Sequence, residues 1–267
     1  MDLEWRIINP ELRDPAEIVA IDDVIHSRVG QGKSEPTLIF YHWQPSLSIG
    51  KPQSLDDLNL AECQKYGIKI VRTPGGGRAV LHLAERDISY SLITQSNGWT
   101  IGDIPSIYKN FCGLIAQALK KIDLPIEIKK DNDFYIYGKK ISGNAIRLEK
   151  NALTQHGIIL YKPHSAELMI RLMNPNLYNL KDLEELRSRL ISVEEIAPHI
   201  KIQDIVKVIT ETLTGGRYKI SQLTEKEMIE VEKAKTKYIN PTWEKGTSIR
   251  GLCWLSKGEA RGSLRGR

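Results

Sequence analysis

Three consecutive glycines at 75–77 stand between Arg72 and Arg78, in the segment RTPGGGRAVLH. Such glycines pack nothing and cost conformational entropy, but their backbone N–H groups can approach an anionic or carbonyl oxygen with no Cβ in the way. Guanidinium groups on either side suit a phosphate or a carboxylate. No Gly-Lys-Ser/Thr sequence follows, so this is not a Walker loop. We predict an oxygen-binding loop; the alternative is a flexible hairpin tip.

A second segment, residues 131–157, combines acids, lysines and small residues: DNDFYIYGKKISGNAIRLEKNALTQHG. Asp133 precedes a strand-like run, and Lys139 and Lys140 enter a Ser-Gly-Asn-Ala sequence that we interpret as a turn. A lysine there can hold its ammonium against a reacting acyl or phosphoryl group, and a nearby acid can hold Mg²⁺ on nucleotide phosphates. Taken alone, both features also fit a solvated hairpin.

The elements that position these segments follow from residue type and periodicity. Asp14 as N-cap and Pro15 at the first helical position predict the start of a helix over 14–29, and Gly138 suits a tight hairpin turn. Strands are predicted at 4–8, 37–43, 68–73, 78–93, 134–150 and 152–161, and further helices at 55–67, 106–122, 166–174, 201–214 and 224–238. We therefore predict an α+β fold, a single domain with a mixed, mostly antiparallel sheet flanked by helices.

Composition narrows the class of protein. The chain has 267 residues, 41% hydrophobic and 27% charged, which excludes disordered and fibrous proteins. No apolar run reaches the roughly 20 residues of a membrane span, and the N-terminus has no signal peptide pattern. Cys63, Cys112 and Cys253 form no CxxC pair, which favours a cytoplasmic protein without disulfides or a zinc site.

The net charge of +5 belongs entirely to residues 245–267, which carry six basic residues and one acid. The rest of the chain is neutral, so no basic face for nucleic acid is indicated. We interpret residues 247–267 as a basic, glycine-containing tail that is poorly ordered. A weaker alternative is that this tail binds nucleic acid.

The two polar segments, in this order, resemble the catalytic domain shared by lipoate–protein ligases, octanoyltransferases and biotin–protein ligases. The glycine loop is similar to R-R-x-[ST]-G-G-[GR]-A-V-x-H, and GKKISGNAIRLEKNALTQHGIIL to G-x-K-[IV]-x-G-[SN]-A…x-H-G-[ST]-[IL]-L. YHWQPSLSIGKPQ, LRSRLISVEEI and the pair Tyr238…Trp243 also match. The resemblance covers roughly residues 3–246 and implies a catalytic domain of the biotin/lipoate ligase type over residues 1–246.

The resemblance implies two successive reactions at one site. ATP with Mg²⁺ activates lipoate or octanoate to an acyl adenylate, which a lysine of an acceptor protein then attacks. The implied acceptors are lipoyl domains of 2-oxoacid dehydrogenase E2 subunits and the glycine cleavage H protein, in some relatives with a separate accessory-domain protein. No nucleic acid or membrane partner is implied.

The resemblance also implies roles for individual residues. Lys140 matches the family's essential lysine and would stabilise developing charge, while Asp133 would hold the metal. His82 could equally be a structural histidine. Acyl or adenylate contacts are implied for Arg72, Gly75, Gly76, Gly77, Arg78, His82, Asn132, Ser142, Gly143, Asn144, Ala145, His156 and Gly157.

The branch of the family depends on cysteine. The octanoyltransferases most like this chain carry a catalytic cysteine before the GKK turn, but PIEIKKDNDFYIYGKK has none, and we interpret Cys112 as a small buried hydrophobe. A thioester route needs a thiol at the site, so we predict a lipoate–protein ligase. Against this, GGRAVLH resembles the octanoyltransferases, and Leu83 replaces an acid of many ligases. The biotin ligase loop is absent; an inactive acyl- or acceptor-binding relative is a further alternative.

Overall fold

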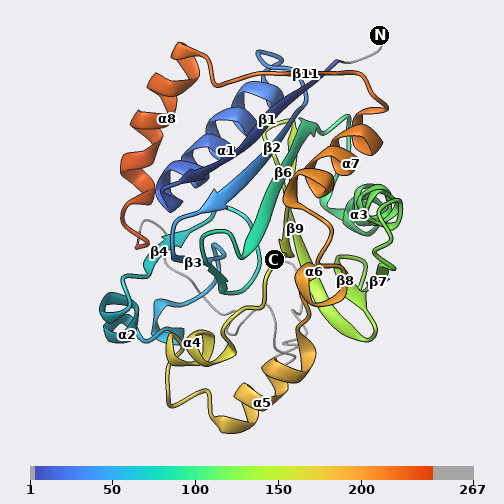
Figure 1. Cartoon of the computed structure of the whole chain (residues 1–267). Helices are drawn as coiled ribbons and strands as arrows, with labels where there is room; N and C mark the ends of the chain where they lie inside the picture. The colour runs from blue at the N-terminus through green and yellow to red at the C-terminus, as the bar shows by residue number, and fades with distance from the viewer. Residues whose placement is uncertain (1–3, 243–267) are drawn as a thin grey trace.

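The structure is a computed structural model that describes residues 4–242; the predictions made for Trp243, Cys253 and the tail at 247–267 lie outside this range. An eight-stranded sheet has the order β11-β1-β2-β6-β10-β9-β8-β7, and a three-stranded sheet has the order β4-β3-β5 (Figure 1). The strands are β1 (Trp5–Arg13), β2 (Thr37–Trp43), β3 (Ser46–Ile49), β4 (Lys69–Arg72), β5 (Val80–His82), β6 (Asp87–Gln95), β7 (Glu127–Lys129), β8 (Asp133–Ile136), β9 (Lys139–Glu149), β10 (Ala152–Leu160) and β11 (Tyr218–Ile220).

Helices cover both faces of the large sheet. On one face α1 packs against α8, and on the other α3 packs against α7 (Figure 1). The helices are α1 (Pro15–Gly30), α2 (Leu60–Lys65), α3 (Ile104–Lys120), α4 (Ala166–Arg171), α5 (Leu180–Arg189), α6 (Val193–Ile196), α7 (Ile202–Thr214) and α8 (Glu225–Tyr238), with short 3-10 turns at Leu55–Asp57 and Ile101–Asp103.

Alternation along β1 and β2 divides the core between these two faces. Ile7 and Leu38 belong to the core cluster on the α3 and α7 side, whereas their neighbours Ile8 and Ile39 belong to the cluster with α1 and α8. Successive side chains of a strand point to opposite faces. Both strands are therefore apolar without interruption at these positions, as strands covered on both sides must be.

The predicted fold class is confirmed. Within the large sheet only the pairs β11–β1 and β1–β2 are parallel, and the other five are antiparallel. The predicted helix start is also confirmed, because the Asp14 side chain accepts from the Ala16 N–H and Pro15 begins α1. Tyr137 and Gly138 both have positive φ, the requirement of a type I′ hairpin turn, between β8 and β9.

Three local predictions need correction. The helix predicted over 55–67 is two pieces, because Leu58 leaves the helix to form a bridge with Met173 and Asn59 caps a new start. The strand predicted over 78–93 is broken between His82 and Asp87 by a turn. The Ser-Gly-Asn-Ala sequence is not a turn; it lies inside β9, paired with β10. None of the helices within 4–242 combines the length and the apolar character needed to cross a bilayer.

Candidate active site

The two polar segments meet at a cavity of about 420 Å³ between the small sheet and the large one. The glycine loop, which joins β4 to β5, forms one side, and β8, β9 and β10 form another. Of the residues predicted from sequence, those that line it are Gly76, Gly77, Arg78, His82, Asn132, Asp133, Lys140, Gly143, Asn144, Ala145, His156 and Gly157.

Lys140 is the buried cation of this cavity. Its ammonium Nζ lies 2.7 Å from Asp133 Oδ1, and the two side chains are only 4% and 16% exposed. Lys139, the preceding residue, faces solvent, as the alternation of a strand requires. The carboxylate of Asp133 holds the ammonium in place and favours its charged form, so the cavity contains a fixed positive charge.

Two asparagines join the start of β8 to the middle of β9 beside this pair. Asn132 Nδ2 donates to the Asn144 carbonyl at 2.8 Å, and Asn144 Nδ2 returns a bond to the Asn132 carbonyl at 2.9 Å. Tyr90 OH donates to Asn144 Oδ1. The predicted contact residues Asn132 and Asn144 therefore fix the backbone that carries Asp133 and Lys140.

Gly157 lies directly between Tyr90 and Asn144 in the sheet register. A Cβ added at Gly157 would fall on the Tyr90 ring, its hydroxyl and the Asn144 amide oxygen. This position requires glycine because the Tyr90–Asn144 hydrogen bond passes over it.

Gly157→Ala is expected to destabilise the protein by about 1–3 kcal/mol, the usual cost of overpacking a core. Urea unfolding monitored by circular dichroism measures it. Gly113→Ala is the matched control, because a Cβ there meets no atom within 4 Å. Equal stability of the Gly157 variant and the wild type would contradict the packing constraint.

The glycine loop is held at a short distance from β3. Gly77 has a φ of +108°, and a Cβ at Gly50 would strike the Gly77 carbonyl. Gly75 is buried, with its carbonyl accepting from the Lys51 N–H at 2.9 Å. Gly76 and Gly77, which are exposed and line the cavity, are therefore the glycines of the loop that lie open to a ligand.

Arg72 was predicted to contact the ligand, and the structure corrects this. Its side chain is 1% exposed and does not line the cavity. The guanidinium donates to four backbone carbonyls, those of Gly50 at 2.9 Å, Lys51 at 3.0 Å, Gln53 at 2.6 Å and Pro241 at 2.8 Å. A guanidinium turned toward these carbonyls braces the base of the glycine loop.

Ser142 is a second correction. It was predicted to form part of the wall, but it is fully buried and does not line the cavity. The register of β8 against β9 shifts between Phe134 and Tyr135, and such an irregularity changes which strand residues face a given side. Ser142 is therefore a packing residue.

His82 lines the cavity and is held on three sides. Its Nε2 lies 2.9 Å from Ser48 Oγ and its Nδ1 3.4 Å from Asp87 Oδ1, and its ring stacks on Trp43 at 4.2 Å. Burial alone would raise the pKa of Asp87, but hydrogen bonds from His164 and His82 outweigh it and lower that pKa to about 2.

Several lining residues escaped the sequence reasoning. Asp22 comes from α1, Ser91 from β6 and Arg189 from the end of α5. Asp22 and Ser91 lie in segments whose apolar periodicity predicts only a helix and a strand. A polar residue on the buried face of α1 was the one available signal for Asp22.

The donors present fit a nucleotide with its Mg²⁺ held mainly by phosphates. In the described part of the chain no group of three or more His, Cys, Asp or Glu side chains is gathered for a metal. Asp133 lines the cavity on the β8 side, and Mg²⁺ is commonly bound by one or two carboxylates plus substrate phosphates.

Neither cysteine between residues 4 and 242 is a cavity thiol. Cys63 and Cys112 are free and buried, and neither lines the cavity. Burial raises the pKa of Cys112 to about 12 and that of Cys63 to about 11. The thiolate is the nucleophilic form, so both groups are poor nucleophiles.

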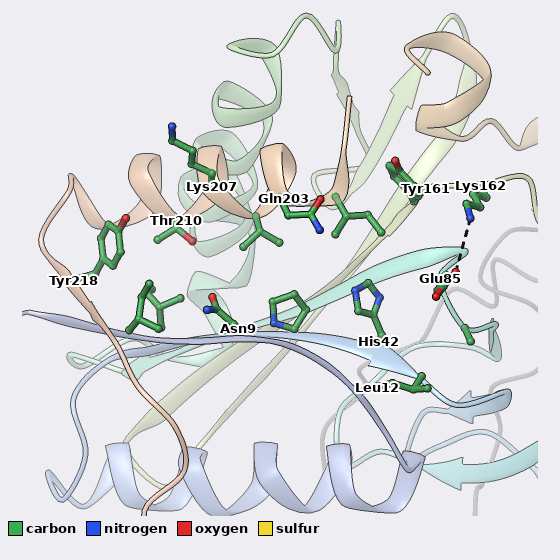
Figure 2. Close-up of a pocket in the computed structure, with 16 residues that line it drawn as sticks. Asn9, Leu12, His42, Glu85, Tyr161, Lys162, Gln203, Lys207, Thr210 and Tyr218 are labelled. Carbon is green, nitrogen blue, oxygen red and sulfur yellow. Dashed lines mark ion pairs between the residues drawn. The ribbon is translucent and has the colours of Figure 1, made fainter. Parts of the chain in front are cut away.

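A larger cavity of about 740 Å³ lies elsewhere, between β1, β2 and α7. Figure 2 shows Asn9 and His42 below it, Gln203 and Lys207 above it, and the ion pair of Lys162 with Glu85 at one end. No residue predicted for the site lines this cavity.

Comparisons with known proteins match the family model of the lipoyl protein ligase A/B catalytic domain to residues 14–214. Octanoyltransferase LipM of Brevibacillus brevis is 27% identical over 90% of this chain and 98% of that protein. Lipoate–protein ligase 1 of Staphylococcus aureus is 26% identical over 90% of this chain and 73% of that protein.

The similar solved structures bear on the fold alone. One is from a bipartite lipoate protein ligase system of Thermoplasma acidophilum, with a TM-score of 0.78 and 21% identity over 94% of this chain and 99% of that one. Another is a lipoate–protein ligase A bound with ATP, with a TM-score of 0.78 and 20% identity over 91% of this chain and 99% of that one.

Proposed function

We infer the reaction from the family, because the chain belongs to the lipoyl protein ligase A/B catalytic-domain family. We propose that it is a lipoate–protein ligase. It activates lipoate or octanoate with Mg·ATP to the acyl adenylate and pyrophosphate, and then transfers the acyl group to a lysine of a lipoyl acceptor domain. Residues 1–246 form the catalytic domain in this proposal, and residues 247–267 take no part in catalysis.

One observation carries the proposal: a buried, carboxylate-held ammonium faces a glycine loop across a cavity that contains no thiol from residues 4–242. A mixed anhydride has a carbonyl oxygen and phosphate oxygens close together. Lys140 supplies charge to these oxygens as the tetrahedral intermediate forms, and the N–H groups of Gly76 and Gly77 bind the same end of the substrate.

The proposed acceptor proteins and the proposed cellular compartment rest on the same family membership. The acceptors are lipoyl domains such as those of 2-oxoacid dehydrogenase E2 subunits and the glycine cleavage H protein. A separate accessory-domain protein is a further partner in this proposal. Free, buried cysteines support the cytoplasm.

The second candidate is an octanoyltransferase that takes its acyl group from acyl carrier protein. Two observations favour it: LipM of Brevibacillus brevis aligns over 98% of its length, and the loop reads GGRAVLH. This route passes through an enzyme thioester and therefore needs a reactive cysteine.

We expect the variant in which Cys63, Cys112 and Cys253 are all replaced by alanine to keep its ligation rate. The assay incubates an apo-lipoyl domain with lipoate plus Mg·ATP, or with octanoyl-carrier protein, and weighs the product by mass spectrometry. Single variants serve as controls for stability, because Cys112 is fully buried. A folded triple variant that loses transfer, together with a wild type that uses only the carrier donor, would establish the octanoyltransferase.

A further inference from the structure

Asp22 projects from α1 into the cavity and gathers three polar groups. Tyr41 OH donates to Asp22 Oδ1 at 2.7 Å, Ser91 Oγ donates to Oδ2 at 2.9 Å, and His156 Nδ1 lies 3.1 Å from Oδ2. The Asp22 side chain is only 8% exposed, whereas that of His156 is 28% exposed. The carboxylate is thus the buried anchor, and the imidazole is the part that reaches the cavity.

This arrangement fixes one tautomer of His156. Ser91 Oγ lies 3.0 Å from His156 Nδ1, and its one proton is donated to Asp22 Oδ2. A carboxylate accepts hydrogen bonds only, so neither neighbour can donate to Nδ1. Nδ1 therefore carries the proton and Nε2 keeps its lone pair. Across residues 4–242, Nε2 of His156 has no hydrogen-bond partner. The Cδ2 atom, next to Nε2 in the ring, is the side-chain atom closest to the glycine loop, 4.0 Å from where a Cβ of Gly75 would stand.

Two other basic groups at the cavity, Lys140 and His82, are held by acidic or polar partners. Lys140 is paired with Asp133 at 2.7 Å. His82 uses both ring nitrogens, on Ser48 and Asp87. His156 is therefore the imidazole at this cavity whose second nitrogen is available to a substrate.

We propose that His156 is the base for the transfer step and that Asp22 positions it. This rests on the proposed function, namely acyl transfer to a lysine. The neutral amine of the acceptor attacks the acyl carbonyl carbon, and a C–N bond forms. Nε2 takes one proton from the attacking nitrogen; the C–O bond to phosphate breaks, and its electron pair leaves with AMP. The imidazolium that results is stabilised by Asp22 and then releases its proton to solvent.

The cavity thereby separates two tasks between two pairs of residues. Asp133 holds Lys140, whose ammonium stabilises negative charge on oxygen, and Asp22 orients His156, whose Nε2 accepts a proton. Environments that differ in this way mark the acid, base and electrostatic roles within one site.

The test compares two nucleophiles that differ in their need for a base. Both nitrogens lose a proton in forming the product. Hydroxylamine is neutral at pH 7 and attacks an acyl adenylate readily without an enzyme base, whereas a lysine amine is mostly protonated at pH 7 and depends on one. The enzyme receives lipoate and Mg·ATP with either hydroxylamine, read as acyl hydroxamate, or an apo-lipoyl domain, read by mass spectrometry.

His156→Gln is expected to lower kcat for the lipoyl domain by about 100-fold, within the usual range for general base catalysis, and to change hydroxamate formation by less than about threefold. Asp22→Asn is expected to show the same selectivity with a smaller loss, because it weakens only the orientation of the ring. His199→Gln, at an exposed position, is the matched control and keeps both rates.

Three outcomes would overturn the proposal in different ways. Equal losses with both nucleophiles would show that His156 binds the adenylate. No loss with either would show that it has no role in transfer. A wild type that modifies no acceptor with any donor would instead refute the proposed function.

Discussion

Lys140→Ala is expected to lower kcat for acyl transfer by about 10²–10³, the usual cost of removing one preorganised donor to a developing oxyanion. Lys140 is the buried cation at this cavity, held 2.7 Å from Asp133. Its loss removes charge stabilisation from the transition state and leaves the carboxylate behind. The KM for the acceptor should change much less, because the effect is on the chemical step.

The matched control is Lys139→Ala, which removes the neighbouring, solvent-facing ammonium of β9. Steady-state kinetics with an apo-lipoyl domain compare both variants, and thermal unfolding confirms that each is folded. Near-normal turnover in a folded Lys140 variant would rule out the assignment, and a large loss in the Lys139 variant would assign catalysis to the wrong face of the strand.

Glu227→Gln is expected to lower the free energy of unfolding at pH 7 by about 3 kcal/mol. Arg6 on β1 donates to both carboxylate oxygens of Glu227 on α8, at 2.7 and 2.8 Å, and the two side chains are 4% and 1% exposed. The same carboxylate accepts the Thr224 N–H at 2.8 Å and closes the capping box of α8. Removing its charge leaves a buried guanidinium uncompensated.

The loss should depend on pH in a defined direction. Burial alone would raise the pKa of Glu227, but the hydrogen bonds and charge of Arg6, with the Thr224 N–H, lower it from 4.5 to about 2. The unfolded chain therefore takes up the proton first, so the contribution is complete above about pH 4.5 and is lost as pH falls toward 2.

Urea unfolding of the wild type and Glu227→Gln at pH 7 and pH 3 measures this dependence, and the difference in unfolding free energy should fall by more than half. Glu230→Ala is the control: Glu230 pairs with Arg28 at 3.1 Å but is 37% exposed, and exposed pairs contribute less than about 1 kcal/mol. A pH-independent loss would mean that the shape of Glu227, not its charge, matters.

The sequence was sufficient to predict the features that depend only on residues close together along the chain. Asp14 and Pro15 begin α1 because a cap and a fixed φ need no distant partner. The glycines at 75–77 and the Lys140 segment could likewise be singled out from the types and order of their residues. The fold class followed from periodicity along the strands and helices.

The sequence was not sufficient where the position of a side chain depends on segments far away along the chain. Arg72 can reach either face of its strand, and only the return of residues 50–53 and Pro241 around it supplies the carbonyls. Ser142 depends on a shift of register between β8 and β9. The role of Asp22 depends on its contacts with Ser91 and His156, which belong to other elements.

The carbonyl cage of Arg72 has a consequence for the order of assembly during synthesis. The carbonyl of Pro241, 169 positions further along the chain, completes this cage. Likewise Arg6 pairs with Glu227, 221 positions further along the chain. Ribosomes add only about 5–20 residues per second, so a nascent chain spends many seconds with the base of its glycine loop open. The N-terminal half therefore emerges before the segment that completes the base of its glycine loop has been made.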